Sequence, residues 1–378
     1  MTAIHGTCAP DFAAVKAAFG ANFDQRDDIG ASVAVSFKGE MVVDLWGGAL
    51  ARGSSEPWQE DTIVNVWSTT KTMAALSLLV LADKGEIDFA APVARYWPEF
   101  AAAGKDSVTV AHVMSHQAGL SGMDQPVEGA TLYDWDFMTR ELAAQAPWWE
   151  PGTGSGYHAL TQGYLQGEIV RRVTGQTLGA FLKHEIADPL GADFQIGVSE
   201  ASRARIGALI PPASTLPGPD DDSIAARTIA SPKVVAAQCN ERGWQDAEIP
   251  AANGHGNARS VVRVQTALAN GGEAWGKRIL SEVGARRVME EQCRGVDQVL
   301  GTPGVFGLGY GINSDLMPLA PNPNVCFWGG YGGSLILVDQ DARMCVSYVM
   351  NRMEPGVQGD LRGMSIAMAA YQALAMRG

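Results

Sequence analysis

Residues 66–73 give the sharpest signal in this chain, and they read Val-Trp-Ser-Thr-Thr-Lys-Thr-Met. They stand directly before residues 74–83, a strongly apolar run with helical periodicity, which predicts that Ser68 opens a helix. Lys71 follows three positions later, and side chains at this spacing lie on one face of a helix about one turn apart. The stretch therefore predicts a serine and a lysine held together at a helix N-terminus.

This pair has the composition of a nucleophile and its base. A serine hydroxyl is a weak nucleophile until a neighbouring group takes its proton, and burial lowers the pKa of a lysine enough for that task. Helix N-terminal amides also favour negative charge that develops near Ser68. The same spacing is found where a serine caps a helix and the lysine is solvated, so the pair alone does not decide the function.

Two glycine-rich segments extend the pattern. Residues 151–157, Pro-Gly-Thr-Gly-Ser-Gly-Tyr, end at Tyr157 before another helix-like run, and a phenol held near the Lys71 ammonium is stabilised as phenolate. Residues 328–334, Trp-Gly-Gly-Tyr-Gly-Gly-Ser, precede a strand and let the backbone approach a ligand closely. Taken singly, these segments are equally compatible with a core tyrosine and an ordinary turn.

In this order and spacing, the three segments resemble the serine β-lactamase and penicillin-binding-protein superfamily. The similarity is greatest to its class C-like branch, which includes the family VIII carboxylesterases. Further matches are found at residues 113–120, 253–260 and 307–311, and the resemblance runs from about residue 28 to 375.

The resemblance implies a role for each matched residue. Ser68 is the acylated nucleophile, Lys71 its base or proton relay, and Tyr157 the group that activates Ser68 and protonates the leaving group. The oxyanion is held by the Ser68 amide and by a second amide, that of Tyr331 or an adjacent glycine. Trp328, Gly329 and Gly330 form the substrate-binding edge beside it.

Two departures from the family pattern bear on the substrate. The second motif reads Tyr157-His158-Ala159 instead of Tyr-x-Asn, and the third begins with Trp328 instead of the lysine of Lys-Thr-Gly. Loss of the amide and the ammonium weakens recognition of an acylated amide and of a carboxylate. This predicts a neutral ester with a short acyl chain as substrate, and Trp-Gly-Gly is common in the esterase branch.

Aromatic and histidine side chains near these motifs are candidates for a substrate pocket. The candidates are Trp148, Trp149, His158 and His255, with Trp244 a weaker one. No metal site and no organic cofactor is expected. An α/β-hydrolase is disfavoured because its nucleophile lies in a Gly-x-Ser-x-Gly elbow, and no serine here has glycine at both −2 and +2. A Ser-His-Asp triad without that elbow would need a histidine, and His158 and His255 are the plausible candidates.

The fold class predicted is α/β (α+β) and β-lactamase-like, with an antiparallel sheet flanked by helices. Hairpins at 31–46 and at 334–350 and a closing helix at 361–376 suggest that both chain ends share one sheet. The predicted domains are 1–69 with 251–378 for the sheet, and 70–250 for a mainly helical insertion. Helices are expected at 70–84, 109–115, 132–146, 160–174 and 177–187, and an irregular loop at 211–250.

Charge and composition exclude other classes. The chain has 378 residues, 28 Lys plus Arg and 41 Asp plus Glu, for a formal net charge of −13. Nucleic acid and anionic membranes are therefore not expected partners. The N-terminal residues lack a secretory signal pattern, no run is long enough to span a membrane, and five scattered cysteines suggest free thiols. A cytoplasmic location is expected.

The sequence thus predicts a serine carboxylesterase that hydrolyses small-molecule esters through an acyl-enzyme. Four alternatives stay open: a β-lactamase, a D-amino-acid peptidase, an acyltransferase, and a catalytically silent binding protein on the same fold. The sequence gives no oligomeric state.

Overall fold

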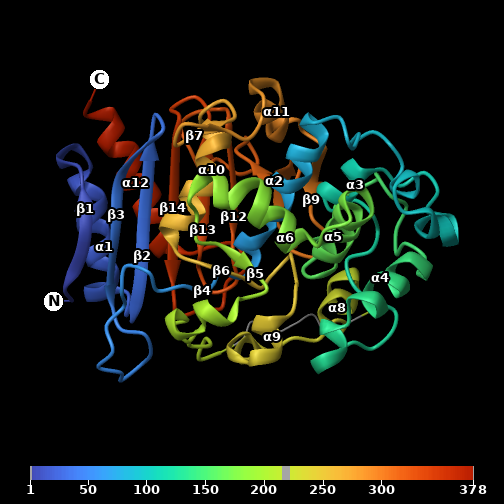
Figure 1. The fold of residues 1–378 in the computed structure, drawn as a ribbon, viewed down its shortest axis with the longest axis horizontal. Coiled ribbons are helices and arrows are strands. Elements are labelled where there is room, and N and C mark those ends of the chain that lie inside the picture. The colour runs from blue at the N-terminus through green and yellow to red at the C-terminus, as the bar shows by residue number, and fades with distance from the viewer. Residues whose placement is uncertain (1, 215–221, 378) are drawn as a thin grey trace.

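A nine-stranded antiparallel sheet is the largest feature of the computed structural model, which describes residues 2–214 and 222–377 (Figure 1). The strand order is β1-β3-β2-β14-β13-β12-β11-β10-β9. Within this sheet β2 pairs with β14, which places Ala31 opposite Met350. The two ends of the chain therefore share one sheet, as predicted. The strands are β1 (Ile4–Cys8), β2 (Gly30–Phe37), β3 (Glu40–Gly48), β9 (Cys293–Val296), β10 (Pro303–Phe306), β11 (Gly311–Ile312), β12 (Val325–Gly329), β13 (Leu335–Asp339) and β14 (Met344–Met350).

Helices fill the middle of the sequence, and each of the five predicted helical windows contains one. The helix α2 is buried along its length from Thr70 to Leu81, which matches its sequence because a helix that is apolar on all sides belongs in a core. The helices are α1 (Ala13–Gln25), α2 (Thr70–Asp83), α3 (Val110–Met114), α4 (Trp135–Ala144), α5 (Thr161–Thr174), α6 (Leu178–Leu182), α7 (Asp188–Leu190), α8 (Ile224–Ala230), α9 (Arg242–Asp246), α10 (Ala258–Ala269), α11 (Glu282–Arg286) and α12 (Leu361–Ala375).

Both predicted hairpins are present. The strands β2 and β3 are joined through Lys38 and Gly39, whose φ angles of 51° and 84° are both positive. Such two-residue turns are favoured because their twist matches that of the strands they connect. In the second hairpin, β13 pairs with β14 so that Leu335 lies opposite Tyr348. The closing helix α12 also lies within its predicted range.

The two faces of the sheet are covered by different helices. On one face, Thr266 of α10 shares a 2.6 Å hydrogen bond with Ser36 of β2. On the other, α12 packs beside α1, and the Arg362 guanidinium lies 5.9 Å from the centre of the Tyr348 ring on β14. Because successive side chains of a strand point to opposite faces, one strand contacts both helical layers.

A small three-stranded sheet connects the start of α2 to a distant part of the chain. It consists of β4 (Val64–Asn65), β6 (Gly254–Gly256) and β5 (Gln195–Ile196) in that order. Val66 donates from its amide to the Gly254 carbonyl at 2.9 Å, and the Gly254 amide donates to Thr70 Oγ1 at 2.9 Å. Residues 251–256 are thereby held beside Ser68. A separate hairpin is made by β7 (Glu273–Ala274) and β8 (Lys277–Arg278).

The predicted irregular loop 211–250 contains only short helical pieces where it is described: α8, a 3₁₀ turn at Ala236–Asn240, and α9. Residues 215–221 of that loop lie outside the described residues. The division of the chain into a sheet domain and an inserted helical domain stays a prediction. Across residues 2–214 and 222–377, none of the helices combines the length and the apolar composition needed to cross a membrane.

Candidate active site

Ser68 lies in a tight turn directly before α2. Residues Trp67–Thr69 form a 3₁₀ turn, and Trp67 has a φ of 49°, a left-handed backbone that a bulky residue rarely adopts. Strain of this kind is concentrated at functional sites, where surrounding packing holds it in place. Ser68 is 7% exposed, so its hydroxyl is nearly enclosed but still reachable. The turn presents the serine at the N-terminus of α2, as the sequence predicts.

The structure brings the three predicted catalytic side chains together around the Ser68 oxygen. Tyr157 donates its hydroxyl hydrogen to Ser68 Oγ at 2.5 Å. Lys71 Nζ lies 3.5 Å from the same Oγ atom. The chain separation between Ser68 and Tyr157 is 89 positions, so this contact depends on the packing of the whole lobe. The catalytic roles themselves stay predictions.

Lys71 is fully enclosed, and its other neighbours are backbone carbonyls. Its Nζ donates to the carbonyl of Ala159 at 2.7 Å and to that of Ala251 at 3.0 Å. Burial lowers the pKa of Lys71 well below its usual value because the charged form loses its hydration. A neutral amine has two N–H groups and one lone pair. In that neutral form the two carbonyls would accept the two hydrogens, and the lone pair would be left for the hydroxyl proton of Ser68.

Burial also affects the protonation of Tyr157. Burial raises the pKa of Tyr157, and the hydrogen bonds with Ser68 and Trp328 only partly oppose this effect. Lys71 Nζ sits over the Tyr157 ring, 4.8 Å from its centre, and is itself shifted toward the neutral amine. A raised pKa favours the protonated phenol over the phenolate, and a phenol suits a proton donor.

The Tyr157 backbone is anchored by a residue that the sequence analysis missed. Asp297 Oδ1 accepts from the Tyr157 amide at 2.9 Å, and also from the amides of Val299 and Leu300 at 2.9 Å. An aspartate that accepts from amides two and three positions later is a common turn feature. Nothing local connects it to Tyr157, 140 positions away, so no sequence signal could have identified this contact.

The turn after β12 contains the candidates for the second oxyanion donor. Within this fully described turn, the Gly330 amide donates to the Ser334 carbonyl, Gly332 to Gly356, and Gly333 to Gly330. The Tyr331 amide has no such backbone acceptor. This favours Tyr331 over an adjacent glycine as the second oxyanion donor beside Ser68, a choice that the sequence left open.

Comparison with known proteins places the chain in a family. Residues 19–371 match the profile of the family described as Beta-lactamase. The chain belongs to the beta-lactamase family. It is 37% identical over 381 residues to the protein named Esterase/beta-lactamase LipL from Mycobacterium tuberculosis, covering 95% of this chain and 86% of that protein.

Two solved structures are also similar to this beta-lactamase family member. A family VIII carboxylesterase is 44% identical with a TM-score of 0.93, covering 98% of this chain and 100% of that one. A penicillin-binding protein homologue from Caulobacter crescentus is 38% identical with a TM-score of 0.92, again covering 98% and 100%. The predicted beta-lactamase-like fold and family are thus confirmed.

In this family member, Trp328 forms part of an aromatic cluster behind Tyr157. The His116 ring stacks on Trp328 at 5.5 Å between ring centres, and it meets Tyr157 edge-on at 5.2 Å. His116 has a φ of 63° and is buried, and burial lowers its pKa well below the usual value. The cluster therefore supports Tyr157 with uncharged rings.

A cavity of about 450 Å³ begins at Tyr157 and Trp328. Gly329, predicted at the substrate-binding edge, also lines it. The four predicted pocket residues, Trp148, Trp149, His158 and His255, do not line this cavity, and their part in substrate binding stays a prediction. Among residues 2–214 and 222–377, no cluster of side chains suited to hold a metal ion is found.

Each of those four side chains has other contacts. His158 accepts from the Leu120 amide at 3.1 Å and shares a 2.6 Å hydrogen bond with the Gly156 carbonyl, and burial lowers its pKa to about 3. His255 is buried, with its pKa lowered to about 4. Both histidines are therefore neutral. The indole of Trp148 donates to Asp124 at 2.8 Å and that of Trp149 to the Gly154 carbonyl at 3.1 Å.

Proposed function

We propose that this chain is a serine carboxylesterase that hydrolyses short-chain carboxylic esters through an acyl-enzyme on Ser68. The observation that carries the proposal is the position of Ser68 Oγ between a buried amine and a phenol, 3.5 Å from Lys71 Nζ and 2.5 Å from Tyr157 Oη. The names of the similar proteins, an esterase/beta-lactamase and a family VIII carboxylesterase, support the same activity.

Acylation follows from the protonation states at the site. Neutral Lys71 takes the Ser68 hydroxyl proton as Oγ attacks the ester carbonyl carbon. The carbonyl oxygen gains negative charge and is held by the amides of Ser68 and Tyr331. As the carbon–oxygen bond to the alcohol breaks, Tyr157 gives its proton to the departing oxygen and regains one from Lys71.

Deacylation reverses this proton path. Water takes the place of the departed alcohol and attacks the acyl carbon, giving its proton to the Tyr157 oxygen while Tyr157 passes its own proton to Lys71. Lys71 then returns a proton to Ser68 Oγ as the bond between Oγ and the acyl carbon breaks. The carboxylic acid leaves, and the starting state is restored. An alcohol in place of water would give acyl transfer through the same intermediate.

The substituted motifs support an ester as substrate. Trp328 places an uncharged ring where the family pattern has a lysine ammonium, and residue 159 contributes only its carbonyl, which accepts from Lys71. No cation is thereby supplied at these two positions for the carboxylate of a β-lactam. Hydrolysis of β-lactams is the second candidate, because the name of LipL includes that activity.

The test is a turnover assay on p-nitrophenyl butyrate and on nitrocefin. We expect Ser68-dependent hydrolysis of the ester with far slower turnover of nitrocefin. Ser68→Ala is the blank. Ser77→Ala is the matched control, because Ser77 lies on the same helix with its hydroxyl bonded to the Met73 carbonyl at 3.0 Å, and it should retain activity. Dominant nitrocefin turnover would replace the esterase by the second candidate, and ester hydrolysis unchanged in Ser68→Ala would contradict both.

The cytoplasmic location stays a sequence-based proposal, as does the division into two domains. Limited proteolysis tests the latter: cuts that leave residues 70–250 as one resistant fragment would support it. An even spread of cuts through that range would contradict it.

A further inference from the structure

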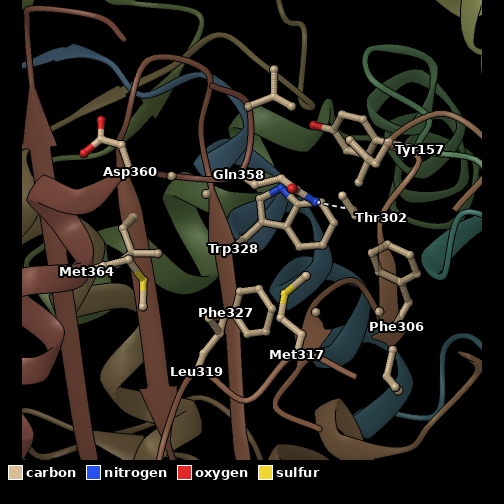
Figure 2. Close-up of a pocket in the computed structure, with 18 of the residues that line it drawn as sticks. Tyr157, Thr302, Phe306, Met317, Leu319, Phe327, Trp328, Gln358, Asp360 and Met364 are labelled. Carbon is tan, nitrogen blue, oxygen red and sulfur yellow. Dashed lines mark hydrogen bonds between the residues drawn. The ribbon is translucent and has the colours of Figure 1, made fainter. Parts of the chain in front are cut away.

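The cavity beside Tyr157 is apolar along most of its wall. It lies between β10, β12 and the start of α12, and Figure 2 shows aromatic and aliphatic side chains around it. Its acidic side chain, Asp360, is already engaged, with Oδ2 accepting from Arg362 at 2.6 Å. At about 450 Å³ the cavity is in the range of small-molecule sites. The wall includes Phe306, Phe327, Met317, Leu319, Leu335 and Met364.

The position of Tyr157 indicates which part of the ester occupies this cavity. Tyr157 is part of its wall, whereas Ser68 is not among the residues that line it. The proposed mechanism gives Tyr157 the task of protonating the departing oxygen, which must come within hydrogen-bond reach of its hydroxyl. The group attached to that oxygen is the alcohol part of the ester. It therefore extends from Tyr157 along the cavity.

The acyl part is bound to Ser68 Oγ after attack, so it begins at a residue that does not line the cavity. There the Trp67 ring, directly before Ser68, packs against Tyr331 and Trp244 with ring centres 5.4 Å and 5.2 Å apart. These rings are in mutual contact, and Trp67 and Trp244 are buried.

We infer that the cavity is the binding site for the alcohol part of the ester, and that it selects apolar alkyl or aryl alcohols of medium size. The inference rests on the proposed function and makes it more specific: apolar bulk increases turnover when it is on the alcohol and not when it is on the acyl group.

Two isomeric esters test this asymmetry. Hexyl acetate has its chain on the alcohol, and methyl heptanoate has the same chain on the acyl group. We expect kcat/KM for hexyl acetate to exceed that for methyl heptanoate by about tenfold or more, after division by the alkaline hydrolysis rate of each ester. Equal values, or a preference for methyl heptanoate, would overturn the inference while leaving the esterase function in place.

A variant that fills the cavity tests whether the preference for hexyl acetate depends on this cavity. Gly304 lines the cavity on the same face of β10 as Phe306, and a Cβ atom placed on it meets no atom within 4 Å. Gly304→Leu should lower kcat/KM for hexyl acetate by about tenfold and leave methyl heptanoate nearly unchanged. Val296→Leu is the matched control, because Val296 pairs with Pro303 on the neighbouring strand but is 65% exposed.

The outcomes separate this inference from the proposed function. If Gly304→Leu changes both esters equally, or neither, the cavity does not bind the alcohol and the inference is wrong. If folded wild-type protein hydrolyses no ester, the proposed function fails and the inference fails with it. Should Gly304→Leu not fold, Met364→Trp narrows the cavity from the opposite wall and carries the same expectation.

Discussion

Two buried lysines, Lys71 and Lys105, lie in closely similar surroundings and differ in one partner. Lys105 Nζ donates to three backbone carbonyls, those of Ala102, Ala143 and Gln145. Lys71 donates to two carbonyls, and its third neighbour is the Ser68 hydroxyl. Burial lowers the pKa of both, that of Lys105 to about 8.

The difference shows what makes a buried lysine a catalytic candidate. A carbonyl only accepts a hydrogen bond, so the three carbonyls around Lys105 engage all three hydrogens of its ammonium. The role of Lys105 is then structural. A hydroxyl can also give up a proton, so the Lys71 site offers proton transfer where the Lys105 site does not. Burial and a lowered pKa are common to both sites, and the third partner separates them.

Replacing Lys71 gives the largest expected effect, a loss of catalytic activity. Lys71→Met should lower kcat/KM for p-nitrophenyl butyrate by at least ~10²-fold, in the range typical of a lost general base. Lys71→Arg should fail equally, because a guanidinium is not deprotonated in proteins. Steady-state kinetics on protein with native circular dichroism measures both. Near-normal turnover by either variant would remove the proposed role of Lys71.

The pH dependence of activity gives the next largest effect. Below the lowered pKa of Lys71 the amine is protonated, and kcat/KM should fall by about tenfold per pH unit as the medium becomes more acidic. Because burial moves that pKa well below the usual value for lysine, activity should already be level before pH 10. A profile that keeps rising to pH 10 would show that Lys71 titrates as an ordinary lysine.

Lys105 should matter for stability instead. Lys105→Met leaves three enclosed carbonyls without their donor, and the free energy of unfolding should fall by about 3 kcal/mol or more. The kcat/KM of the folded variant should stay within about twofold of wild type, since the change lies outside the proposed site. Urea denaturation and the ester assay together test this. A stable variant with lost activity would reverse the two assignments.

The smallest expected effect is the pH dependence of that stability. The pKa of Lys105 is about 8 in the folded state against 10.5 for an ordinary lysine. Between these values the unfolded chain binds a proton that the folded chain does not, so raising the pH favours folding in this window. The stability of wild type relative to Lys105→Met should therefore increase from pH 8 to pH 10. If the stability difference between wild type and Lys105→Met does not change with pH, the pKa of Lys105 is not lowered by folding.

The sequence determined the parts of this protein that local chemistry specifies. The helical period after Ser68 predicts α2, the two β-rich runs around Lys38 and Gly39 predict the first hairpin, and the order and spacing of the motifs predict the family. It also identifies Ser68, Lys71 and Tyr157, which the structure brings together, because each stands in a recognisable local pattern of helix start or glycine-rich turn.

Only the tertiary structure decided what depends on contacts between distant parts of the chain. The two carbonyls that accept from Lys71 lie 88 and 180 positions away, and Asp297 reaches Tyr157 across 140. The raised pKa of Tyr157 results from burial, which is a property of the folded protein and is not specified by the residues next to Tyr157. Aromatic residues near a motif did not reveal the cavity, because cavity walls are set by strand order and helix packing, and local composition does not specify these.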